Sequence, residues 1–300
     1  MLVLAVCTNN NYNYLFNCLD SVKRQSNQNF NLIIQDNSPK ESKDQEHLID
    51  LVGKIDNFYF NDFKANGLSQ SRNICSNLAV EIFNSEFIHY IDDDVLLPND
   101  FIDNLHHSIS SLVDPKAIGS KILPHWGSVS KPNWFTDQLY PLLSILDFGD
   151  RIKQYGGENG VWWLGGANIC FHIDTLHELG GFNVQLGRNS NNQGLMGSEE
   201  NEILSKMKDV GLVVYDPSFP VFHTIREERL NKQWMIKRCV WQSVCDVLTD
   251  SKWQDSISDP ETRIREAAES IIMHGEKVDF CNFLSKVQYL SFKLLKGELD

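Results

Sequence analysis

Short apolar runs alternate with segments of helical spacing over the first part of the chain, which is the pattern of successive strands and helices. Strands are predicted for four runs, which are Leu2 to Cys7, Phe30 to Gln35, Asn57 to Phe60 and Phe87 to Ile91. Helices are predicted from recurring apolar residues over 13–26, over 68–83 and from Pro98 to Leu112, and a fifth strand over Ala117 to Ile122. This alternation predicts an α/β fold with a doubly wound, mostly parallel sheet flanked by helices.

Polar side chains directly follow three of these predicted strands. Thr8 and Asn9 follow the first strand, Asp36 and Asn37 follow the second, and Asp92 to Asp94 follow the fourth. In doubly wound sheets, ligands bind beyond the carboxyl ends of the strands. We therefore expect a single crevice to collect these side chains.

The regular alternation of predicted strands and helices ends after about residue 122. Residues 124–160 are rich in Pro, Trp, Gly and Asp and are expected to form loops with short elements. A strand is expected over Val161 to Phe171, in which Gly165 and Gly166 allow a neighbour or ligand to come close. The remaining predictions are a helix from Glu199 to Val210, a strand over Val213 to Tyr215, and helices over 230–250 and 261–296.

The composition is that of an ordinary globular protein, with 42% hydrophobic and 22% charged residues. The formal net charge of −13 argues against a nucleic-acid partner, because binding phosphate backbones requires a basic surface. The seven cysteines are scattered and form no Cys-x-x-Cys pair, which favours reduced, buried thiols. No apolar run has the length of a secretion signal or a membrane span, so we expect a protein of the cytoplasm or of the inner face of the membrane.

Three consecutive carboxylates interrupt the apolar segment FIHYIDDDVLLP, at Asp92, Asp93 and Asp94. Adjacent carboxylates repel one another and resist burial, so solvent, a cation or a catalytic task must compensate them. On an extended chain Asp92 and Asp94 face the same way, which would form a hard-oxygen site for Mg²⁺ or Mn²⁺. A solvated acidic turn is the structural alternative.

The same segment also resembles the nucleophile motif of haloacid-dehalogenase-type phosphohydrolases, in which the first Asp attacks phosphorus. That interpretation needs an acidic pair after another strand, and Gly149-Asp150 is the nearest candidate. The motif would normally lie on the first strand, whereas at least two strand–helix units precede it here.

Two further segments carry candidate chemistry. Glu199 and Glu200 follow Ser198, a good N-cap, and acidic residues in a first turn also favour the helix by themselves. His223 follows an apolar stretch and opens a locally basic segment, residues 223–240, with five Lys or Arg against two Glu. In an acidic protein such a segment suggests an anionic partner such as a diphosphate, or a solvated helix face.

Taken together, six segments resemble those of glycosyltransferase family 2, whose fold is called GT-A. In chain order they read VLAVCTNNNYNYLFNCLDSVKRQSNQNFNLIIQDNSPK, NGLSQSRN, FIHYIDDDVLLPNDFI, GGANICFHIDTLHELGGFN, GSEENEILSKMKDVGLVVYDP and PVFHTIREERLNKQW. Two features depart from the family pattern. The opening strand lacks Pro-Thr-Tyr-Asn, and the base element reads Glu199-Glu200 where Glu-Asp is common.

The resemblance implies an inverting, metal-dependent glycosyltransferase of the hexosyltransferase type, active in polysaccharide biosynthesis with a UDP-sugar as donor. Its metal, Mn²⁺ or Mg²⁺, would be held by Asp92, Asp94 and His223. The residues expected at the nucleotide sugar are Thr8, Asn9, Asp36, Arg72, Asp92, Asp93, Arg226 and Arg229. Glu200 or Glu199 would take the proton of the acceptor hydroxyl.

The acceptor side is expected at Trp162, Trp163, Gly165 and Gly166, with a glycan, a lipid-linked sugar or another hydroxyl compound as acceptor. We expect residues 1–122 to bind the donor, residues 123–229 to form the acceptor and catalytic half, and residues 230–300 to form a helical C-terminal extension. The amphipathic spacing over 278–296 fits packing on the domain or peripheral contact with a membrane. A non-catalytic module that binds nucleotide sugars remains an alternative.

Overall fold

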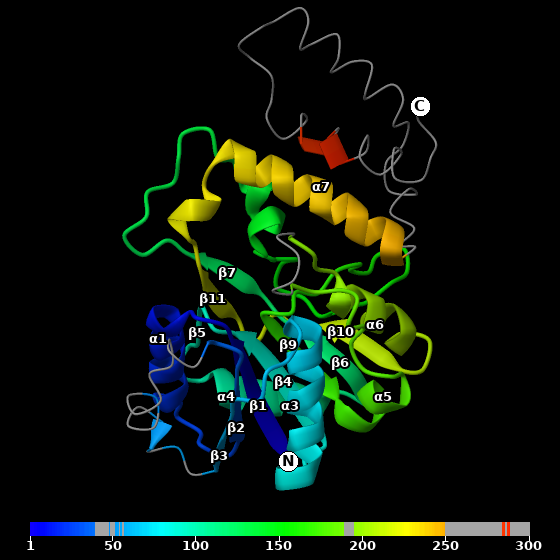
Figure 1. The fold of residues 1–300 in the computed structure, drawn as a ribbon. Coiled ribbons are helices and arrows are strands. Elements are labelled where there is room, and N and C mark those ends of the chain that lie inside the picture. Colours follow the sequence, from blue (N-terminus) through cyan, green and yellow to red (C-terminus); the bar gives the residue numbers. More distant parts are fainter. Residues whose placement is uncertain are drawn as a thin grey trace, which may run out of the picture.

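The computed structural model describes residues 1–39, 48, 52–53, 55, 57–188, 195–249, 284–285 and 287–288. An eight-stranded sheet forms the centre of this described part (Figure 1). In spatial order its strands are β3 (Phe58–Asn61), β2 (Asn31–Asp36), β1 (Leu2–Thr8), β4 (Phe87–Asp92), β9 (Asn168–His172), β6 (Pro115–Gly119), β10 (Leu212–Tyr215) and β8 (Lys153–Gln154).

The sheet is mostly parallel, as the sequence predicts. Strands β3, β2, β1 and β4 pair in parallel, and so do β6 and β10, whereas β9 and β8 run antiparallel to their neighbours. The parallel register places Cys7 opposite Gln35 on one side and opposite Asp92 on the other. The carboxyl ends of β1, β2 and β4 therefore meet at one edge of the sheet.

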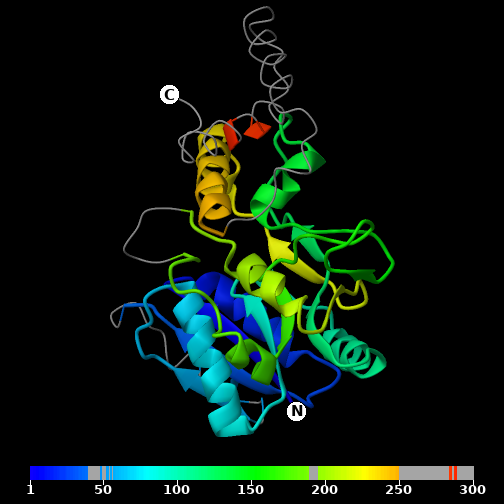
Figure 2. The same ribbon diagram turned by 90° about the vertical axis from the view of Figure 1, so that its right-hand side faces the viewer.

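Helices cover both faces of this sheet. The described helices are α1 (Tyr12–Lys23), α3 (Leu68–Phe83), α4 (Phe101–Ser111), α5 (Ile173–Glu178), α6 (Glu199–Met207) and α7 (Lys232–Thr249), with 3-10 turns η2 (Asp137–Leu143) and η3 (Glu227–Arg229). Side chains alternate between the faces of β4. The ring of His89 lies 5.2 Å from that of Phe101 on α4, whereas Tyr90 donates a hydrogen bond to Arg72 O on α3. Figure 2 shows α3 and α4 on opposite sides of the sheet.

A second, three-stranded sheet lies beside the first and contains β5 (Val95–Leu96), β11 (Val221–Thr224) and β7 (Ile122–His125). The predicted fifth strand over Ala117 to Ile122 is therefore divided. Its first part belongs to β6 of the large sheet, and Ile122 begins β7 of the small one. Pairing of β11 with β5 sets His223 opposite Val95, directly after the acidic triplet.

Three other local predictions need correction. The predicted strand over Val161 to Phe171 begins only at Asn168, so Gly165 and Gly166 lie in the loop before it. Asp93 and Asp94 form a turn between β4 and β5, and the chain is not extended there. Pro98 precedes α4 instead of opening it, since that helix has its N-cap at Asp100.

The first helical prediction in the C-terminal part is confirmed by α7, which lies beyond the carboxyl ends of the parallel strands (Figures 1 and 2). The prediction over 261–296 falls almost wholly outside the described residues. Within it, Leu284 is buried in the main apolar core and Val287 packs against that core. No helix of the described part is both long enough and apolar enough to span a membrane.

The cysteines behave as predicted in the described part. Six of them are free thiols, and five of these six are buried. Cys7 and Cys75 approach to 3.9 Å between their sulfur atoms, which is a contact and not a disulfide.

Candidate functional site

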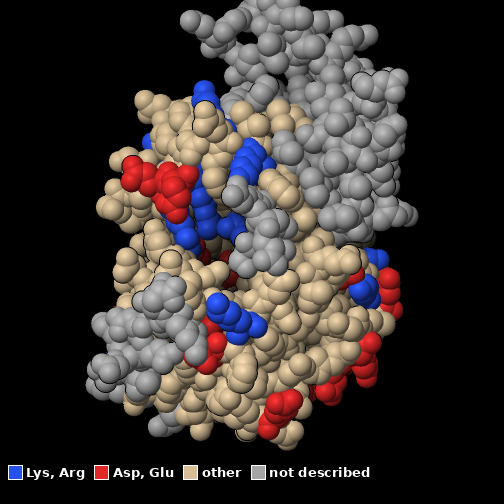
Figure 3. Space-filling view, in the orientation of Figure 1, with Lys and Arg blue, Asp and Glu red and all other residues tan. Residues whose placement is uncertain are grey.

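A cavity of about 1090 Å³ opens beyond the carboxyl ends of β1 and β4 and reaches to α7. Most of the predicted site residues line it, namely Thr8, Asn9, Arg72, Asp92, Asp93, Asp94, Trp163, Gly165, Gly166, Glu199, Glu200, His223, Arg226 and Arg229. Figure 3 shows basic side chains gathered around this hollow, with acidic ones deep inside it. The expected single crevice is thus present.

Two predicted site residues do not line the cavity. Asp36 is fully buried, and its carboxylate accepts hydrogen bonds from Tyr12 Oη at 2.6 Å and from the backbone N–H of Ser38 at 2.8 Å. Its neighbour Asn37 lines the cavity instead. Trp162 is 59% exposed and packs near Tyr155, away from the cavity that its neighbour Trp163 lines.

Asp92, Asp94 and His223 form the candidate metal centre. Each offers one ligand atom, and these atoms lie within 4.8 Å of one another. Asp92 ends β4, Asp94 lies in the turn that follows, and His223 comes from β11. A further bond fixes this arrangement, because Thr224 N donates to the backbone oxygen of Asp94 at 2.9 Å. Two carboxylates and an imidazole are a donor set that suits Mn²⁺ or Mg²⁺.

Positive charge surrounds Asp94. Its Oδ1 lies 3.2 Å from His223 Nε2, and its Oδ2 accepts from Arg226 Nε at 2.8 Å. Arg229 Nη2 lies 3.8 Å from the same Oδ2. Burial by itself would raise the pKa of Asp94, but His223 and the two arginines outweigh it, so the pKa lies well below its usual range. The low pKa favours the ionised carboxylate of Asp94, which is the form that binds a cation.

Asp93 shares Arg226 with Asp94, since Arg226 Nη2 lies 3.6 Å from Asp93 Oδ1, but its hydrogen bonds go to other residues. It accepts hydrogen bonds from Thr8 Oγ1 at 2.6 Å and from Asn11 Nδ2 at 2.8 Å. Burial, together with the charge of Asp94, raises the pKa of Asp93 to about 7. Asn11 was not among the predicted site residues, and its position just after the first strand was the available signal.

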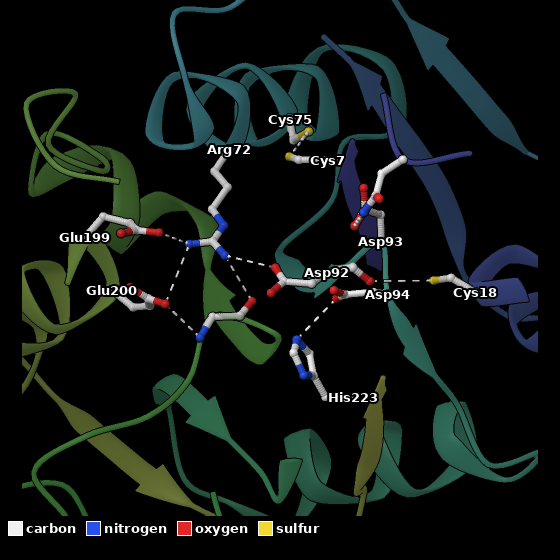
Figure 4. Close-up of polar contacts among 12 residues, drawn as sticks. Cys7, Cys18, Arg72, Cys75, Asp92, Asp93, Asp94, Glu199, Glu200 and His223 are labelled. Atoms are coloured by element: carbon white, nitrogen blue, oxygen red, sulfur yellow. Dashed lines mark hydrogen bonds and ion pairs between the residues drawn. The ribbon is translucent and has the colours of Figure 1, made fainter. Parts of the chain in front are cut away.

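Arg72 joins the two halves of the site (Figure 4). Its Nη1 bonds Glu199 Oε1 at 2.9 Å, and its Nη2 lies 3.5 Å from Asp92 Oδ1. Nη2 also donates to the backbone oxygen of Gly166 at 3.2 Å. Burial alone would lower the pKa of Arg72, but Glu199 and Glu200 outweigh it and raise the pKa. The sequence suggests that Arg72 binds the phosphates of the donor. In the structure its guanidinium instead pairs with carboxylates of the protein, Glu199 and Asp92.

The two glutamates of α6 have unequal surroundings. Glu199 is 2% exposed, its Oε2 has no hydrogen-bond partner among the described residues, and burial followed by the charge of Glu200 raises its pKa to about 7. Glu200 is less buried and accepts a hydrogen bond from Gly166 N at 2.9 Å. Ser198 occupies the N-cap position but makes no capping bond to the helix, and its Oγ accepts from Gln242 on α7.

Gly166 shows why a glycine stands in this loop. A Cβ added there would lie 2.4 Å from Glu200 Oε1 and 2.5 Å from Arg72 Nη2, which is closer than real Cβ contacts come. The sequence predicts close approach at this glycine, and in the described structure the side chains of Glu200 and Arg72 fill that space.

Solved structures of low sequence identity share the fold. The mannosyltransferase PcManGT from Pyrobaculum calidifontis, solved with GDP-Man and Mn²⁺, matches with a TM-score of 0.58, 12% identity, and coverage of 98% of this chain and 86% of that one. The 1–349 form of S. aureus TarS with UDP matches with a TM-score of 0.56, 13% identity, and coverage of 99% and 91%. The chain spans 55% of the length of the longer TarS structure. The fold is therefore that of the GT-A glycosyltransferases.

Sequence comparison shows a likeness to known glycosyltransferases. Residues 3–112 match the family model described as Glycosyl transferase family 2. A curated relative from Haloferax volcanii, named glucosyl-dolichyl phosphate glucuronosyltransferase, is 24% identical over 270 residues, which are 88% of this chain and 82% of the relative. Residues 3–112, which contain the first three of the six motifs, are therefore similar to a glycosyltransferase family 2 domain.

The phosphohydrolase alternative finds no support in the site. Asp150, its candidate acidic partner, has a 92% exposed side chain and pairs with Lys121 at 2.5 Å. It does not line the cavity that Asp92 enters. The strand before the acidic triplet is also the fourth in the chain and not the first.

Proposed function

We propose that this glycosyltransferase transfers a sugar from a nucleotide sugar, a UDP-sugar, to an acceptor hydroxyl with inversion at the anomeric carbon. One observation carries the proposal. The possible metal ligands Asp92, Asp94 and His223 line the same cavity as the acidic pair Glu199 and Glu200. A single displacement on a sugar diphosphate needs a cation to stabilise the leaving diphosphate and a carboxylate base to accept the proton of the acceptor hydroxyl.

The residues present fit a divalent cation. Their ligand atoms are hard or borderline donors, and Asp94 stays ionised. Bound there, Mn²⁺ or Mg²⁺ would supply Lewis-acid compensation of the charge on a diphosphate leaving group. Asp92, Asp94 and His223 would hold the cation. Arg226 and Arg229, which now contact Asp94, would supply further positive charge to the phosphates.

Glu200 is the better placed of the two candidate bases. Glu199 is committed to Arg72 within the protein, whereas Glu200 reaches the cavity with one oxygen held by Gly166 N. That bond orients the carboxylate so that its other oxygen can take the proton of an acceptor hydroxyl. In the proposal Glu199 and Arg72 position the helix turn that presents Glu200.

In this proposal the donor and acceptor sides keep the division of the chain that the sequence predicts. Residues 1–122 would bind the nucleotide, through Thr8, Asn9, Asp93 and, from beneath the cavity wall, Asp36. Residues 123–229 would receive the acceptor near Trp163, Gly165 and Gly166. The extension, residues 230–300, would close the cavity with α7 and offer a face for a membrane surface. Trp162 would reach an acceptor only beyond the cavity.

The relatives guide the choice of substrates. The Haloferax volcanii relative is named for a dolichyl-linked acceptor, and TarS and PcManGT are solved with uridine and guanosine nucleotides respectively. We propose a lipid-linked sugar as acceptor class and a protein at the inner face of the membrane.

The test is a calorimetric titration of UDP and GDP into the protein, each with and without Mn²⁺. Binding of UDP that requires the metal, and that is lost in Asp94→Ala, is the expected result. Transfer measured with a UDP-sugar should then disappear in Glu200→Gln, while that variant still binds UDP and Mn²⁺. Full turnover by Glu200→Gln would contradict the assigned base, and metal-independent binding would contradict the assigned cation site.

A further inference from the structure

Five arginines line the cavity, and they differ in their partners. Arg72, Arg226 and Arg229 each lie within 4.0 Å of a carboxylate. Arg188 and Arg238 make no ion pair with a described residue. The contact found for the Arg238 guanidinium is a long bond of 3.4 Å from Nη1 to the backbone oxygen of Leu195. Arg188 and Arg238 therefore have no ion-pair partner among the described residues.

The two uncompensated arginines are held by neighbouring backbone. The oxygen of Arg188 accepts from Leu68 N, at the start of the helix that carries Arg72. Arg238 lies on α7, and its Nη2 would stand 3.6 Å from a Cβ at Gly197, just before Glu199 and Glu200. A Cβ at Gly187, the residue before Arg188, would stand 3.3 Å from Glu199 Cδ. Both arginines therefore belong to segments that lie beside the acidic pair of α6.

The charges of these arginines act on one another. Partial loss of hydration, followed by the charge of Arg238, lowers the pKa of Arg188 against the opposing effect of Asp92, Asp94 and Glu199, although the residue as a whole is exposed. Like charges so placed destabilise each other unless an anion lies between them.

The donor diphosphate accounts for only part of this positive charge. In the proposed function, the diphosphate is met by the cation of Asp92, Asp94 and His223 and by Arg226 and Arg229. Arg238 lies instead on the far side of the cavity, against the loop at Leu195 and Gly197. An anion between Arg188 and Arg238 would lie near the first turn of α6, which carries Glu199 and the proposed base Glu200.

We propose that Arg188 and Arg238 form a second anion subsite, which binds a phosphate or carboxylate carried by one of the two sugars in the reaction. The proposal rests on the proposed function and names its substrate class, a charged sugar or a sugar phosphate. Paired guanidinium groups suit both anions, because each can donate two parallel hydrogen bonds. The subsite favours a charged substrate over a neutral one, because a neutral substrate leaves the positive charges of both arginines without a partner.

Matched pairs of probes test the subsite by calorimetry in the presence of Mn²⁺. The donor arm compares UDP-glucuronate with UDP-glucose, and the acceptor arm compares a glucosyl phosphate with methyl glucoside on protein saturated with UDP. The variants are Arg188→Gln and Arg238→Gln. The control is Lys237→Gln, which removes the same charge from an exposed position on α7 outside the cavity lining.

The wild type should bind the charged member of one pair at least about tenfold more tightly than the neutral member, and either variant should remove most of that preference. The arm that shows the preference identifies the source of the anion. UDP affinity should stay within about twofold in all variants. No preference in either arm, or a preference kept by both variants, overturns the subsite. Equal loss of UDP affinity assigns these arginines to the diphosphate and also overturns it. Failure of the wild type to bind UDP with Mn²⁺ would instead refute the proposed function.

Discussion

Arg72 Nη1 lies 2.9 Å from Glu199 Oε1, and both side chains are only 3% exposed. The pair joins α3 to the first turn of α6, two elements far apart in the chain. The guanidinium also lies 5.6 Å from the ring of Phe182 and 5.8 Å from that of Tyr90. These contacts hold the Arg72 side chain in place. Its guanidinium in turn lies within 4.0 Å of carboxylate oxygens of Asp92, Glu199 and Glu200.

Removing the guanidinium should destabilise the fold, because Glu199 would then be a buried charge without a partner. We expect Arg72→Met to lower the free energy of unfolding by about 3–5 kcal/mol, as for other broken buried pairs. Urea denaturation followed by circular dichroism measures this. Arg24→Met is the matched control, since its pair with Asp20 is exposed and should contribute no more than about 0.5 kcal/mol. Equal effects of the two substitutions would contradict the role of Arg72.

Stability should also depend on pH through Glu199. Its pKa is raised to about 7 in the folded state, so between the unfolded value, about 4.3, and 7 the folded state binds more protons. Its contribution to stability is therefore present at low pH and lost as pH rises through that window. Glu199→Gln should flatten the fall in denaturation midpoint between pH 4.5 and 7. A slope unchanged from that of the wild type would show that Glu199 is not the group responsible.

The space beside Gly166 should be essential for the base. Gly166→Ala places a methyl group against Glu200 Oε1 and Arg72 Nη2, so both must move. We expect at least about a hundredfold loss of turnover, since small misplacements of catalytic groups cost that much. Gly197→Ala is a control in the same cavity, because the nearest atom, Arg238 Nη2, is 3.6 Å away. Steady-state kinetics with a UDP-sugar should separate the two, and similar turnover in both would count against the positioning of Glu200.

His223 should be required for metal-dependent donor binding. His223→Ala removes one of the three proposed ligands, and we expect at least about a tenfold loss of UDP affinity in Mn²⁺, as changes near metal sites commonly produce. UDP affinity in a chelator should be unchanged. His107→Ala, at an exposed position on α4, provides the control in the same titration. Metal dependence that survives in His223→Ala would remove this imidazole from the site.

The sequence by itself determined the strand–helix order and the edge of the sheet where the site lies. Apolar spacing fixed α3 to the residue and placed β1, β2 and β4 to within a residue or two. Parallel pairing then necessarily brings Thr8, Asn37 and Asp92 to one edge. These features are local or follow from a general rule of sheet topology, so a single sequence is enough to predict them.

The family resemblance suggested that His223 joins Asp92 and Asp94, but only the tertiary structure decided how the distant groups meet. The register of β11 on β5 sets His223 beside Asp94, and burial of Arg72 between α3 and α6 turns a predicted phosphate ligand into the partner of Glu199. Arg188 belongs to none of the six motifs, yet it lines the cavity. A backbone hydrogen bond from Leu68 N to its oxygen holds it at the start of α3. Such pairings depend on long-range register and on the cost of burying unpaired charge. Neither leaves a periodic or compositional trace along the chain.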